Sequence, residues 1–134
     1  MKINTSTFIK IWKILHYTSI IISILFFILY FLPPTPLKPF IPYVSIITGF
    51  IFYGIYLALS LLILYGIYKK SKVGYYSSMA YIFLKLIDAV TDIIWGINYQ
   101  GFISIIIGIV RITFLTFIGY FVYKIRGYFE IKWT

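Results

Sequence analysis

Four ionisable side chains lie inside apolar stretches of this 134-residue chain: Lys85, Asp88, Asp92 and Arg111. Ionisable groups among apolar residues can bind and release protons or ions, which makes them candidates for a transport path. They also carry two charges of each sign, so they could neutralise one another in a structural network. A third interpretation is that some of them meet opposite charges on another subunit. The residue types alone leave all three interpretations open.

Three of these charges belong to one polar stripe along a predicted helix. Successive polar positions are three or four residues apart, which is the spacing of side chains on one helical face. The positions are Ser78, Tyr81, Lys85, Asp88, Asp92, Trp95 and Tyr99. A charge that faces lipid at mid-membrane costs about 3 kcal/mol, so we expect the stripe to face protein or water. Toward the N-terminal end of this predicted helix, only Tyr81, Ser78 and Ser77 could continue a proton path. These are few groups for a proton relay.

Depth along the helices predicts which charges meet. The apolar stretches 75–97 and 101–123 are joined by three residues, so they form a tight antiparallel hairpin. At about 1.5 Å per residue, Asp88 lies roughly 20 Å and Arg111 roughly 18 Å from the same end of this hairpin. We therefore predict an Asp88–Arg111 ion pair. Lys85 would share the Asp88 carboxylate or extend toward water, and Asp92 would be left over near the outer end.

Other kinds of site chemistry find little support. The chain has no cysteine and one histidine, His16, which argues against disulfides, thiolate ligation and a metal centre. We expect His16 to be a polar residue at the inner membrane interface, although a haem held by His16 and Met79 is geometrically conceivable. No P-loop, nucleophile elbow, zinc-protease or dinucleotide motif occurs. The prediction is therefore a protein with no enzymatic activity and no cofactor.

The amino-acid composition indicates that the chain lies in a membrane and not in water. The chain is 62% hydrophobic and 11% charged, whereas soluble domains are about half apolar and about a quarter charged. Four apolar stretches are long enough to cross a bilayer as helices, residues 14–32, 43–68, 75–97 and 101–123. We predict an all-α integral membrane protein, a compact four-helix bundle that forms a single transmembrane domain over residues 1–134.

The first stretch and the segment after it need separate consideration. No small-x-small cleavage site follows residues 14–32, so we interpret this stretch as a retained anchor and not as a signal peptide. All five prolines of the chain lie between Pro33 and Pro42. Such a composition favours an extended polyproline segment, which acts as a stiff spacer or binds a proline-recognising partner.

Basic residues predict the orientation in the membrane. One side of the four predicted spans carries nearly all of them: Lys2, Lys10, Lys13, Lys69, Lys70, Lys72, Lys124, Arg126 and Lys132. The loop between the first two spans carries only Lys38. Lysine and arginine concentrate on cytoplasmic loops, and an even number of spans places both termini on one side. We therefore expect a multi-pass protein of the cell membrane with both termini in the cytoplasm.

Small residues four positions apart indicate where helices approach closely. Such pairs are Ser45 with Gly49, Gly54 with Ala58, and Ser104 with Gly108. They predict packing sites for helices of the same bundle or of another subunit. The basic and aromatic segment 124–134 is typical of an interfacial segment on anionic lipid.

Taken together, these features predict a non-catalytic accessory or structural subunit of a larger membrane complex, for example an energy-transducing assembly. One alternative is a small oligomeric ion channel or ion-coupled transporter that uses the four embedded charges. Another is a structural membrane protein of an enveloped particle. Expected partners are the bilayer and other membrane subunits or further copies of the chain. Nucleic acid is not expected, because topology already explains the net charge of +9.

Overall fold

The computed structural model describes residues 4–31 and 46–130, and the regular structure in these ranges is helical. The elements are α1 (Thr5–Phe31), α2 (Ile46–Lys69), α3 (Lys72–Trp95), the π-helical turn η2 (Gly96–Gln100), α4 (Phe102–Lys124) and the 3-10 turn η3 (Arg126–Phe129). The predicted all-helical fold with four long helices is thereby confirmed. The proline-rich segment and Ser45 lie outside the described residues.

Three of the long helices are long and apolar enough to cross a membrane, over Thr5–Ile28, Ile51–Lys69 and Phe102–Lys124. Helix α3 is as long as α2, but the charged side chains within it, Lys85, Asp88 and Asp92, lower its apolar character. Many large hydrophobic side chains of α1 and α4 are exposed at the surface, as expected where the surrounding medium is lipid. The chain is therefore a membrane-spanning helical protein.

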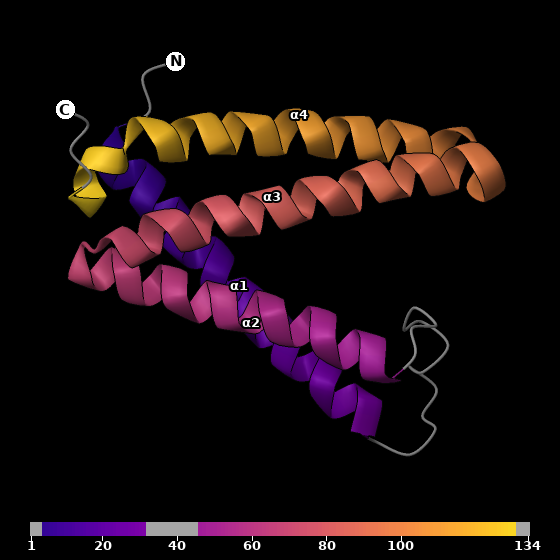
Figure 1. Ribbon diagram of the computed structural model, residues 1–134, viewed down its shortest axis with the longest axis horizontal. Coiled ribbons are helices and arrows are strands. Elements are labelled where there is room, and N and C mark those ends of the chain that lie inside the picture. Colours follow the sequence, from indigo (N-terminus) through magenta and orange to yellow (C-terminus); the bar gives the residue numbers. More distant parts are fainter. Residues whose placement is uncertain (1–3, 32–45, 131–134) are drawn as a thin grey trace.

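The helices pack in a series in which α3 lies between α2 and α4, and α1 packs against α2 (Figure 1). At one end the start of α1, the α2–α3 turn and η3 come together. Toward the other end the α1–α2 pair diverges from the α3–α4 pair (Figure 1). The predicted compact bundle is thus closed at one end and open at the other.

The hydrophobic core lies at the closed end. All four long helices contribute to it, together with η3 and the residue before η3, Ile125. Its buried members are Phe8, Ile9, Trp12, Ile63, Ile67, Tyr75, Ile82, Val122, Ile125 and Phe129. Three of them explain why α1 begins at Thr5, well before the predicted start at residue 14. Phe8, Ile9 and Trp12 are buried while Lys10 is exposed, so this part of α1 is amphipathic and packs on the core.

Close backbone approaches determine how α3 meets its neighbours. A Cβ atom built on Gly108 would lie 2.3 Å from Cγ1 of Ile93, and one built on Gly96 would lie 2.8 Å from Cβ of Ser104. Gly108 therefore lets α4 approach α3, and Gly96 lets η2 approach the start of α4. The predicted three-residue link is shorter in the structure, because η2 continues the helix to Gln100. Gly101, with φ +76°, then reverses the chain.

Candidate functional site: a polar column along α3

The embedded charges pair differently from the prediction. The Arg111 guanidinium on α4 donates a hydrogen bond to the Asp92 carboxylate on α3, so the predicted Asp88–Arg111 ion pair is wrong. Asp92 and Arg111 lie nearly the same number of residues from Gly101, one on each side of the turn. Because the turn sets the register of the hairpin, it brings these two side chains to one level, with Asp88 one helical turn further away.

The Asp92–Arg111 ion pair lies at the protein surface. Its side chains are 48% exposed for Asp92 and 35% exposed for Arg111. Among the described residues it is the one salt bridge between side chains. A charge pair that is so open to its surroundings, in the middle of an apolar hairpin, would be costly if lipid covered it.

Asp88 and Lys85 are brought together through a tyrosine of α2. The Tyr56 hydroxyl donates a hydrogen bond to the Asp88 carboxylate. The Lys85 ammonium lies over the Tyr56 ring, 4.0 Å from its centroid, and 5.7 Å from the centroid of Tyr81. Lys85 therefore makes cation–π contacts. One predicted arrangement has Lys85 sharing the Asp88 carboxylate with Arg111; in the structure Lys85 and Asp88 both contact Tyr56.

His16 is buried between helices of the bundle, and its depth at the inner membrane interface stays a prediction. Its side chain is 1% exposed, and Nδ1 lies 3.1 Å from the Ser60 hydroxyl of α2. The ring also meets Trp12 and Tyr81 edge-on, at centroid distances of 4.4 and 4.8 Å. Because α1 begins at Thr5, His16 lies roughly three turns inside the helix, where α2 and α3 cover it. Its Nε2 atom is buried without a hydrogen-bond partner in the described part of the chain.

Two further hydrogen bonds extend these polar contacts toward the closed end. The Trp12 indole donates to the Ser78 hydroxyl at 3.1 Å, and Ser78 donates to the carbonyl of Gly74 at 2.7 Å. On the other side, Ser60 donates to Ser19 of α1 at 3.4 Å. We call the whole set the polar column. It consists of Trp12, His16, Ser19, Tyr56, Ser60, Ser78, Tyr81, Lys85, Asp88, Asp92 and Arg111.

The column contains five members of the predicted polar stripe, without Trp95 and Tyr99, and adds partners from the neighbouring helices. Trp12, His16 and Ser19 on α1, and Tyr56 and Ser60 on α2, were not identified as site residues. Their spacing carried the signal, because each set repeats at three or four residues and so shares a helical face. The polar side chains of α3 are thus joined to polar side chains of α1, α2 and α4.

The predicted small-residue pairs have different environments. Gly108 of α4 faces α3, and Ser104 of α4 faces Gly96 of η2, as the close approaches above show. On α2, a Cβ atom built on Gly54 would meet nothing within 4 Å, and Ala58 is exposed. Gly49 belongs to α2, but the surroundings of side chains 46–50 lie outside the described part. The Gly54–Ala58 face is therefore open in the single chain.

Within residues 4–31 and 46–130, no group of three or more histidine, aspartate or glutamate side chains could hold a metal ion. Partners for the column's acids are a tyrosine hydroxyl and a guanidinium instead. The arrangement joins α1 to α2, α2 to α3 and α3 to α4 through polar side chains, and such networks hold helices in a fixed register. Comparison with models of known families, with curated proteins and with solved structures found no match.

Proposed function

We propose that α3 is a fourth membrane span and that both termini are cytoplasmic, in the cell membrane. Helix α3 lies between α2 and α4, which are themselves apolar enough to cross, so it has to traverse the same thickness. Lys10, Lys69, Lys72 and Lys124 all lie near the closed end, where the ends of the four helices meet (Figure 1). Such a concentration of lysine is typical of the cytoplasmic side.

The function that this geometry supports best is that of a non-catalytic subunit of a larger membrane complex. The half-exposed Asp92–Arg111 ion pair carries the proposal. Because η2 continues the helix to Gln100, Asp92 lies about 14 Å from the α3–α4 turn, which is deeper than predicted and close to the middle of a hydrocarbon core of about 30 Å. Lipid is a poor neighbour for a charge pair at this depth, whereas polar or charged groups of a second membrane protein would satisfy it.

The open face of α2 supports the same proposal. Gly54 has free space where a side chain would be, and Ala58 next to it on the helix is exposed. Small residues let another helix approach closely enough for extensive van der Waals contact. The chain therefore presents one polar and one small-residue surface to neighbouring helices.

Purification in mild detergent tests the subunit proposal. We expect the wild-type chain to co-purify with other membrane polypeptides in fixed stoichiometry. A variant that combines Asp92→Leu with Arg111→Met should lose them, because it removes both charges together. Ile106→Ala, which shortens an exposed side chain on a different face of α4, is the control. A homo-oligomer without other polypeptides would refute the proposal.

A second candidate function is proton-coupled transport along the polar column. The observation that favours it is a run of buried and half-buried protonatable groups, in which His16 and Tyr56 contact the Tyr81 ring and Tyr56 donates to Asp88. Embedded ionisable residues mark proton paths in many pumps and transporters. Proteoliposomes that contain a pH-sensitive dye test it. Wild-type protein should conduct protons and Asp88→Asn should not, and a silent wild type or an unaffected variant would exclude the function.

A further inference from the structure

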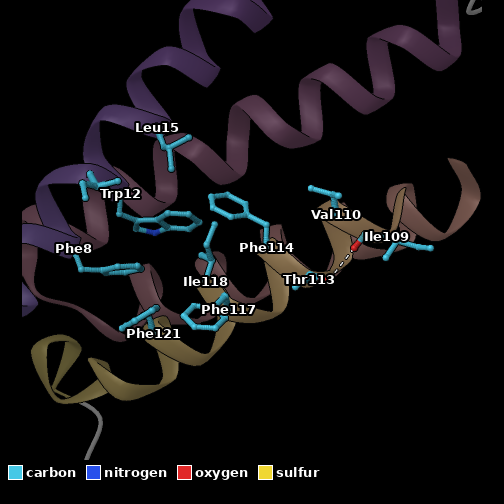
Figure 2. Close-up of a pocket in the computed structure, with 11 residues that line it drawn as sticks. Phe8, Trp12, Leu15, Ile109, Val110, Thr113, Phe114, Phe117, Ile118 and Phe121 are labelled. Atoms are coloured by element: carbon cyan, nitrogen blue, oxygen red, sulfur yellow. Dashed lines mark hydrogen bonds between the residues drawn. The ribbon is translucent and has the colours of Figure 1, made fainter. Parts of the chain in front are cut away.

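Helices α1 and α4 enclose an apolar groove of about 560 Å³ on one side of the molecule. Figure 2 shows Phe8, Trp12 and Leu15 of α1 facing the aromatic side chains of α4, among them Phe117 and Phe121. The hydroxyl of Thr113 is also part of the lining, but it donates to the carbonyl of Ile109 within α4 at 3.0 Å. The Thr113 hydroxyl is therefore already paired, and the groove wall is otherwise made of apolar side chains.

The length and shape of the groove fit one hydrocarbon chain. Along α4 the lining extends from Ile109 to Phe121, which is about 18 Å at 1.5 Å per residue. One leaflet of a bilayer is about 15 Å deep, half of the hydrocarbon core. The rings of Phe8 and Phe121 stack at 5.7 Å and bring α1 and α4 together at the end of the groove that lies near the closed end of the bundle. From there the groove runs toward the middle of the membrane.

The charge near this closed end is positive. Lys124 follows Phe117 and Phe121 on the same stripe of α4, one turn beyond the lining, and its side chain is exposed with Nζ 5.5 Å from the Tyr120 ring centroid. Lys10 on α1 and Arg126 in η3 lie at the same end. Glu130 is the one acidic residue of the chain outside α3. A negative headgroup is therefore favoured at the place where the groove meets the membrane surface.

We propose that the groove binds one acyl chain of an anionic phospholipid and that Lys124 contacts the phosphate of its headgroup. The apolar walls bind the chain through van der Waals contact, and the positive charge selects the headgroup. Lys10 and Arg126 strengthen the positive potential at the same end. The proposal requires a membrane environment but no partner subunit, so it stands or falls separately from the subunit proposal.

Native mass spectrometry of the full chain in mild detergent tests the headgroup selection. Two lipids with the same acyl chains are added, dioleoyl phosphatidylglycerol and dioleoyl phosphatidylcholine. We expect one phosphatidylglycerol per chain, retained about fivefold more strongly than phosphatidylcholine. Lys124→Gln should remove most of this difference. Lys69→Gln, which removes the same charge at the same end but on α2, should preserve it.

A second pair of variants tests the groove itself. Thr113→Phe introduces a ring into the groove and should weaken the retention of both lipids. Thr116→Phe makes the same substitution at an exposed position of α4 outside the lining and should have no such effect. Equal retention of the two lipids by wild-type protein, or equal effects of the two phenylalanine variants, would overturn the proposal. It would also be overturned if Thr113→Phe changed the oligomeric state and left lipid retention unaltered, because a second copy would then occupy the groove.

Discussion

Gly66 of α2 and Gly74 of α3 touch backbone to backbone next to the turn that joins these helices. A Cβ atom built on Gly66 would lie 2.1 Å from the Cα of Gly74, and one built on Gly74 would lie 2.8 Å from the Phe129 ring. The ring of Phe129 is fully buried. Two glycines thus bring α2 and α3 into contact and leave the space that the segment after α4 fills.

We predict that Gly66→Ala destabilises the protein, because its methyl group would collide with backbone atoms that cannot move without separating α2 from α3. Overpacking of this kind costs about 1–3 kcal/mol. Gly54→Ala is the matched control, since it adds the same methyl group to the same helix in open space. The control should be neutral or stabilising by up to about 1 kcal/mol, because alanine favours helix. Thermal unfolding in detergent, followed by circular dichroism, measures both, and equal midpoints would contradict the prediction.

Phe129 should contribute strongly to stability although it lies beyond the last long helix. Phe129→Ala would leave a cavity between η3 and the α2–α3 turn, at a cost of about 3 kcal/mol. Phe102→Ala removes the same ring from an exposed position at the start of α4 and should change the unfolding midpoint little. If the two variants unfolded at the same temperature, the docking of η3 on the core would be wrong.

A double-mutant cycle can identify the partner of Arg111. We expect a coupling energy of roughly 0.5–2 kcal/mol between Asp92→Asn and Arg111→Met, and nearly additive effects for Asp88→Asn with Arg111→Met. Tyr56→Phe with Asp88→Asn should again be coupled, because Tyr56 donates to that carboxylate. The free energy of unfolding in detergent provides the four values of each cycle. Stronger coupling of Arg111 to Asp88 than to Asp92 would restore the pairing predicted from depth.

The buried His16–Ser60 contact should also be measurable. Ser60→Ala leaves Nδ1 of His16 buried without a partner, which costs about 1–3 kcal/mol. The additional change His16→Phe should recover part of this loss, because it removes the imidazole that Ser60→Ala leaves without a partner. Thr18→Ala serves as a control, since Thr18 is exposed and bonds only to the carbonyl of Ile14 in its own helix. A loss of stability no larger than that of the control would show that His16 does not depend on Ser60.

Local patterns were sufficient to predict the helices and the hairpin between α3 and α4. Hydropathy and a spacing of three or four residues depend on neighbouring positions alone, so they predicted four apolar helices and the polar stripe of α3. The start of α1 was misplaced because Lys10 and Lys13 resemble a boundary. In the folded chain Lys10 remains exposed, whereas its neighbours Phe8, Ile9 and Trp12 are buried.

Only the tertiary structure decided which polar groups meet. Asp88 and Asp92 occupy the same face of α3 one turn apart, so the sequence alone allows either to reach Arg111. The π-helical turn Gly96–Gln100 and the positive φ of Gly101 set the register of the hairpin, and that register selects Asp92. The environment of His16 likewise depends on how α1 is rotated against α2 and α3. Its contacts there, Ser60 and Tyr81, are both far from His16 in the sequence. Helix formation follows from local spacing, whereas the partner of a buried charge follows from how the helices are joined and rotated against one another.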